Sequence, residues 1–214
     1  MKIKTLALAA ALAVAAPAFA DTVNLSGFTF PPGSPVNAGA PNYSGLAGQF
    51  TGTLNGNSFV TFCTDIAQQF SFNVNYTDYS VVSGVSAWGA AKSMDMDRAV
   101  SAMMTAGYPM DSATSAAAQS IIWEIIYEGS NAYDFSSGTF TVTSGDAGVT
   151  AALASINWAA LPSEPILYHV DKLYSREHQD FMVVTEVPEP STYALFAAGL
   201  AGIGFIARRR SRRG

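Results

Sequence analysis

The chain has 214 residues, 49% of them hydrophobic and 12% aromatic. This length accommodates one ordinary domain with targeting segments, and the apolar content suffices for a core, so a disordered body is excluded. All 16 acidic residues fall between Asp21 and Glu189, where there are only four basic residues and the formal net charge is four minus 16, or −12. The four are Lys92, Arg98, Lys172 and Arg176. A surface this acidic repels nucleic acid and anionic lipid, so nucleic-acid binding is excluded.

Residues 1–20 have the three parts of a secretory signal peptide. Lys2 and Lys4 give a positive start, residues 6–16 form an apolar run, and a small-residue cleavage site ends at Ala20. We expect cleavage after Ala20 and export of the remainder. The alternative is a short membrane anchor, but the run is too short to span a bilayer.

Residues 21–186 are expected to form one extracellular domain that opens with a loop. Prolines stand in this opening among Gly and Ser, a composition typical of irregular structure. They are Pro31, Pro32, Pro35 and Pro41.

A hairpin and a separate strand are predicted next. Residues 49–54 and 58–63 flank Asn55 and Gly56, the dipeptide preferred in two-residue hairpin turns. Residues 71–76 alternate between apolar and polar side chains, as a half-buried strand does. Its apolar face would carry Phe72, Val74 and Tyr76.

Helical periodicity then replaces the alternation. Residues 95–106 place a stripe of apolar side chains on one face and end at Gly107. The stripe consists of Met96, Ala99, Val100 and Met103. Asp111 or Ser112 can cap a second helix that runs to Glu128 and is closed by Gly129.

Strands are expected again near residues 140–143, 166–170 and 181–185, and there are no internal repeats. The chain is therefore predicted to be α+β. We expect a β-rich sandwich or barrel-like domain with an inserted helical part, between a signal peptide and a C-terminal transmembrane sorting helix.

Residues 187–214 carry three features in order. Pro188, Glu189 and Pro190 come first, and the uncharged segment 191–207 follows, at the lower limit of the ~17–25 residues that span a bilayer as a helix. A basic cluster ends the chain: Arg208, Arg209, Arg210, Arg212 and Arg213. These arginines predict a cytoplasmic C-terminus for a membrane helix.

This arrangement resembles the PEP-CTERM sorting signal over residues 187–214. The resemblance implies recognition by an exosortase, a membrane protease that cuts near the motif. It also implies export through the inner membrane to the envelope, surface or exopolysaccharide matrix of a Gram-negative bacterium. A plain membrane anchor is the alternative, and either leaves the body facing outward.

Two residues of the body stand out chemically. Cys63 is the single cysteine, so no intramolecular disulfide is possible. The thiol is either buried and inert or present because of its chemistry. Gln119 lies at the edge of the apolar stripe of the second helix, where its amide would be partly dry and must find a partner. The stripe comprises Ala118, Ile121, Ile122, Ile125 and Ile126.

The segments around Cys63 and Gln119 resemble the two motifs of bacterial thioester domains, an aromatic-Cys pair on a strand and an apolar-Gln-x-Ala-Ile-Trp helix. The resemblance covers roughly residues 45–185. It implies a thioester between Cys63 and Gln119, shielded by Phe62 and Trp123. One departure is Ile121, which stands where the family usually has Ala.

A thioester is a stored electrophile that an external amine or hydroxyl opens, leaving the partner attached through Gln119. It survives only in a site that excludes water. The resemblance thus predicts a surface adhesin that attaches to an extracellular nucleophile or polysaccharide matrix. The alternative is a passive structural or carbohydrate-binding matrix protein in which Cys63 is simply packed.

No enzyme, metal or cofactor is predicted. His169 and His178 are the only histidines, and no zinc-protease, nucleophile-elbow or phosphate-loop pattern occurs. Residues 84–88 approach a nucleophile elbow but lack its last Gly. Asp95 and Asp97 are interpreted as a solvated helix N-terminus. The carboxylates Glu124 and Glu128 are interpreted as the exposed face of the Gln119 helix.

Overall fold

The computed structural model describes residues 20–129, 132–188, 196 and 198–201. Nearly all of the predicted signal peptide and most of the predicted membrane helix lie outside these residues, as do Glu189, Pro190 and the terminal arginines. Within the described ranges, no helix is long and apolar enough to cross a membrane.

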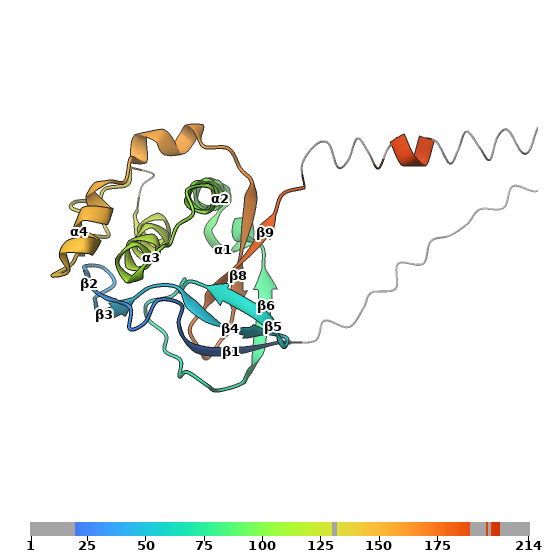
Figure 1. The fold of residues 1–214 in the computed structure, drawn as a ribbon, viewed down its shortest axis with the longest axis horizontal. Coiled ribbons are helices and arrows are strands. Elements are labelled where there is room, and N and C mark those ends of the chain that lie inside the picture. The colour runs from blue at the N-terminus through green and yellow to red at the C-terminus, as the bar shows by residue number, and fades with distance from the viewer. Residues whose placement is uncertain (1–19, 130–131, 189–195, 197, 202–214) are drawn as a thin grey trace, which may run out of the picture.

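The main body is a six-stranded antiparallel sheet in the order β5-β4-β1-β6-β8-β9. Its strands are β1 (Asp21–Phe28), β4 (Phe50–Leu54), β5 (Asn57–Thr61), β6 (Tyr76–Val82), β8 (Tyr168–Tyr174) and β9 (Phe181–Glu186). The sheet curls until its two edge strands meet (Figure 1). Thr61 Oγ1 donates to Met182 O at 2.7 Å, and Cys63 forms an isolated bridge with Phe181. The result is a nearly closed, barrel-like sheet.

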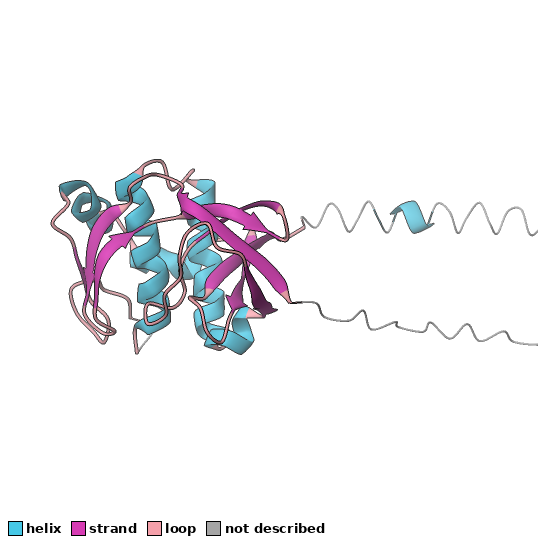
Figure 2. Cartoon of the chain, turned by 90° about the horizontal axis from the view of Figure 1, so that it is seen from below, coloured by secondary structure: helices cyan, strands magenta, loops and turns pink. Residues whose placement is uncertain are grey.

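A second, three-stranded sheet lies beside the barrel in the order β3-β2-β7 (Figure 2). It consists of β2 (Ser34–Ala38), β3 (Tyr43–Ala47) and β7 (Val142–Thr143). The prediction of a loop over the proline-rich opening is therefore wrong, since β1, β2 and β3 all lie there. Pro35 pairs with Leu46 of β3 on one side. On the other side β7 pairs with β2 only at Asn37 and Ala38, so Pro35 lies at an edge, where a missing N–H is tolerated.

The helical part is inserted between β6 and β8, as predicted. Its elements are α1 (Gly84–Trp88), α2 (Ala90–Thr105), α3 (Ser112–Tyr127), α4 (Ala147–Ala154) and the 3-10 helix η1 (Trp158–Ser163). Sequence periodicity located α2, which begins five residues earlier than expected, and α3. Asp111 caps α3, accepting from Thr114 N at 2.8 Å in a capping box. The elements α1, α4 and η1 were not predicted.

The strand predicted over residues 71–76 is absent, and β6 begins only at Tyr76. Asn73 has a φ of 62°, a left-handed conformation that interrupts an extended strand. Phe72 and Val74 are 37% and 40% exposed and so do not form the expected buried face. The 49–63 hairpin is confirmed, with Asn55 and Gly56 both at positive φ.

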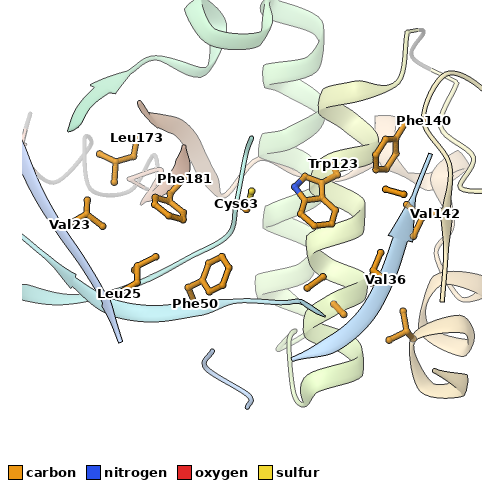
Figure 3. Packing of buried hydrophobic residues seen from close by; sticks show 14 of the residues in the cluster. Val23, Leu25, Val36, Phe50, Cys63, Trp123, Phe140, Val142, Leu173 and Phe181 are labelled. Carbon is orange, nitrogen blue, oxygen red and sulfur yellow. The ribbon is translucent and has the colours of Figure 1, made fainter. Parts of the chain in front are cut away.

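Two apolar clusters form the core, and α3 contributes to both. The first fills the barrel and reaches the small sheet through Trp123 (Figure 3). The second packs α2 and α3 against residues of β8 and β9, such as Val170 and Met182. Because α3 lies between the clusters, its residues from Ser115 to Ile125 are all buried. The polar side chains of this helix must therefore find partners inside the protein.

Candidate functional site

Cys63 lies at the seam where the barrel closes. It follows β5 on the strand of the Asn-Gly hairpin, and its side chain is 1% exposed. Its bridge to Phe181 and the bond from Thr64 N to Asp180 O, at 2.9 Å, hold this backbone against the start of β9. The hairpin and β9 together thus fix the position of the sulfur.

Gln119 meets Cys63 across the fold. Gln119 is 1% exposed, and its carboxamide makes two hydrogen bonds to the Cys63 backbone. Cys63 N donates to Gln119 Oε1 at 2.9 Å, and Gln119 Nε2 donates to Cys63 O at 2.8 Å. The structure brings together the two residues that sequence reasoning paired, and the Cys63 backbone is the partner that the buried amide requires.

The Cys63 sulfur is surrounded by polar groups as well as rings. Its thiol donates to Asp65 O at 3.1 Å, and Gln179 Nε2 donates to the sulfur at 2.7 Å. Burial raises the pKa of the thiol to about 12, although the nearby Trp123 indole and the contacts with the Asp65 backbone and Gln179 act to lower it. The group is therefore a protonated thiol at neutral pH.

Trp123, to which the thioester resemblance assigns shielding, lies in the same core cluster as Cys63. It is 2% exposed, its ring contacts Tyr43 edge-on at 5.1 Å between centroids, and its indole nitrogen points toward Cys63 (Figure 3). Phe62 does not share this role, because it packs in the second cluster, on the other face of its strand. Ile121, which departs from the thioester motif, also packs in the second cluster and away from the sulfur's cluster.

Gln179 and Asp65 are site residues that sequence reasoning missed. Gln179 lies in the turn between β8 and β9, and Asp65 acts through its backbone carbonyl, to which Gln179 Nε2 also donates at 3.1 Å. No local pattern distinguishes a turn glutamine or a backbone oxygen. Only the fold of the barrel brings them to Cys63.

The interpretation of Glu124 and Glu128 as an exposed face is wrong, because they are 0% and 3% exposed. Glu124 Oε1 accepts from Asp134 N at 2.8 Å, and Glu128 Oε2 accepts from Thr139 N at 2.8 Å. Burial, opposed by the Asp134 N–H and reinforced by the charge of Glu128, raises the pKa of Glu124 to about 7. These carboxylates anchor the segment after α3, which the helix pattern alone does not reveal.

Asp95 and Asp97 are not a solvated helix N-terminus either, since α2 begins at Ala90. Asp97 is 7% exposed and accepts from Val170 N at 2.8 Å. Asp95 accepts from the Tyr133 hydroxyl at 2.7 Å. Both carboxylates therefore join α2 to neighbouring segments. In the part of the chain that the structure describes, no three His, Cys, Asp or Glu side chains group as metal ligands.

A Ser-His-Asp grouping also occurs, but its geometry is that of a turn. Ser175 Oγ donates to Asp78 Oδ2, and it accepts from His178 N at 2.9 Å and from Glu177 N at 3.1 Å. A hydroxyl that donates directly to the carboxylate and accepts two backbone N–H groups is not activated by the imidazole. Residues 84–88, the other candidate for serine chemistry, form helix α1.

Comparison with known proteins identifies the tail. Residues 186–212 match the PEP-CTERM protein-sorting motif, so the sorting signal expected from the sequence is confirmed. The motif indicates an exported protein of the cell envelope or surface that is sorted by an exosortase. No curated protein and no solved structure matches the chain. The role of the body must accordingly be argued from its geometry.

Proposed function

We propose that the body of this exported protein stores an internal thioester between Cys63 and Gln119 and uses it to attach covalently to an extracellular amine or hydroxyl. The observation that carries the proposal is the pair of hydrogen bonds that holds the Gln119 carboxamide against the Cys63 backbone in a dry site. The protein would then be an adhesive binding module and not a turnover enzyme, because each copy reacts once and its thioester is consumed.

Formation of the bond needs no external reagent. The Cys63 sulfur attacks Gln119 Cδ, an S–C bond replaces the C–N bond, and the thiol proton leaves with the nitrogen as ammonia. Cys63 N–H, 2.9 Å from Oε1, is suitably directed to stabilise negative charge on that oxygen as the sulfur adds. Cys63 O orients the nitrogen that departs.

Capture is a second substitution at the same carbon, in which the sulfur is now the leaving group. An amine or hydroxyl attacks Gln119 Cδ, the S–C bond breaks, and the nucleophile's proton goes to the sulfur. The partner ends as an amide or ester of residue 119, and the Cys63 thiol is regenerated. A groove of ≈ 590 Å³ is lined in part by Thr64 and Asp65, which directly follow Cys63, and a nucleophile would have to pass inward from such a surface to reach the buried bond.

The alternative is a structural role, in which the Gln119 carboxamide only satisfies the hydrogen-bonding groups of the Cys63 backbone. Such a protein would be a passive component of the matrix. The two possibilities differ in covalent mass, so a single measurement separates them.

The experiment compares intact masses of the full chain, freshly purified after export, with those of the Cys63→Ala variant prepared identically. A thioester lowers the wild-type mass by one ammonia. Methylamine then produces an N-methyl amide one methylene heavier than the glutamine form. A wild-type mass without the deficit, in folded protein that also takes up no methylamine, refutes the proposal.

The position of the methylamine tag identifies the acyl residue. Trypsin cleaves at Lys92, Arg98, Lys172 and Arg176, which places Gln119 and Gln179 in different peptides. We expect the tag on Gln119 alone. The isosteric Gln119→Glu variant, which has no ammonia to lose, should show neither the deficit nor the tag, whereas Gln179→Leu should retain both.

A further inference from the structure

Gln179 contacts the sulfur of Cys63 more directly than Gln119 does in the described contacts. Its Nε2 lies 2.7 Å from the sulfur and 3.1 Å from Asp65 O, so its two amide hydrogens serve both atoms. The Gln179 backbone is also fixed, since its carbonyl accepts from the Tyr79 hydroxyl at 2.6 Å. The amide is thus held over the sulfur from the β8–β9 turn.

Trp123 provides a second N–H near the Cys63 sulfur. Its Nε1 is buried and, among the described residues, meets no acceptor at hydrogen-bonding geometry. The nitrogen nevertheless points toward Cys63 (Figure 3). A buried indole N–H without a partner is costly in free energy. The sulfur would become an acceptor for it on gaining negative charge.

Opening a thioester places charge on the sulfur, because the S–C electron pair stays with it until a proton arrives. Cys63 is 1% exposed in the first core cluster, and this burial opposes that charge. Donors aimed at the sulfur offset this penalty, as donors do wherever charge develops in a transition state. The same donors assist formation, since attack by the sulfur passes through the same charge distribution.

We infer that the hydrogen bond from Gln179 to the Cys63 sulfur, together with the Trp123 N–H, stabilises this sulfur as the leaving group when the thioester opens. This inference rests on the proposed function. It adds a role for the β8–β9 turn that neither motif of the sequence contains.

The test measures the rate of methylamine uptake by full-length protein carrying Gln179→Leu. Loss of a hydrogen bond to a developing thiolate is expected to slow opening by about tenfold or more. Gln68→Leu is the matched control, because Gln68 Nε2 donates to Arg176 O in the same turn and not to the sulfur. Gln179→Glu, which keeps the size of the side chain, should also open slowly because its carboxylate cannot donate.

A spectroscopic measurement separates a direct effect on the sulfur from general loosening of the turn. Cys63 is the only thiol in the chain, so the Raman S–H band of the methylamine-opened protein reports this sulfur alone. We expect Gln179→Leu to shift the band and Gln68→Leu to leave it in place.

The outcomes distinguish the two ideas. Wild-type opening rates or an unmoved S–H band in Gln179→Leu would overturn the inference while leaving the thioester intact. A wild-type protein with no mass deficit would overturn the proposed function and the leaving-group role with it. In that case the S–H band of the untreated protein still decides whether Gln179 donates to the sulfur.

Discussion

The buried carboxylate Glu124 allows a test of the energetics of α3 that does not depend on any covalent chemistry. Its side chain is 0% exposed in the last turn of α3, and one of its oxygens, Oε2, has no hydrogen-bond partner among the described residues. Glu124→Gln preserves the shape of the side chain and an acceptor for Asp134 N while removing the charge. The variant therefore isolates the cost of ionisation.

The magnitude follows from the pKa of Glu124, which burial raises from 4.5 to about 7. The folded protein binds this proton more tightly than the unfolded chain, so the stability that it contributes is complete below about pH 4.5 and is lost as the pH rises through about 7. A difference of this size corresponds to about 3 kcal/mol. The wild type should lose that much unfolding free energy relative to Glu124→Gln between about pH 4.5 and about pH 8.

Urea denaturation followed by tryptophan fluorescence across this pH range measures the effect. Glu177→Gln, which removes the same charge from an exposed position, is the control. A difference between wild type and Glu124→Gln that stays constant with pH would refute the argument from burial. A difference of opposite sign would mean that a cation stabilises the ionised carboxylate.

Three further substitutions test other parts of the fold. Asp111→Ala removes the cap of α3 and should cost about 1 kcal/mol in denaturant unfolding. Gly52→Ala places a methyl group 2.0 Å from Asn24 O on the paired strand, so we expect the β1–β4 ladder to be disrupted and the yield of folded protein to fall. Lys172→Met leaves the buried Asp180 carboxylate without its ion pair, 2.6 Å long, and should lower the unfolding free energy at neutral pH by about 3–5 kcal/mol. Recovery of that loss in acid, where Asp180 is protonated, would support the assignment.

Sequence reasoning succeeded where a short stretch determines its own structure. The Asn55-Gly56 turn specifies the hairpin that carries Cys63, and the cap at Asp111 with the following apolar period specifies α3. It failed where distant segments decide the outcome. Residues 71–76 alternate like a strand, but Asn73 in a left-handed conformation ends the alternation, and the barrel pairs β1 with β6 instead.

The same distinction separates the parts of the candidate site. Cys63 and Gln119 were paired by a resemblance between short motifs, and the fold brings them into contact. Glu124 looked exposed because helix periodicity assigns one buried face, whereas α3 is enclosed on several sides by two clusters. Gln179 carried no signal because a turn residue acquires its neighbours only when β9 closes the barrel.

The strand that closes the barrel is also the last one before the sorted tail. β9 ends at Glu186, the tail motif begins at that residue, and the first residue of β9 is bridged to Cys63. Tension applied to an anchored tail would therefore be transmitted along β9 as shear across its six residue pairs with β8. At the far end of that ladder Phe181 is bridged to Cys63, and Met182 packs in the cluster that contains α2 and α3, so mechanical load on a tethered molecule would reach the strand of Cys63 and the helical packing together.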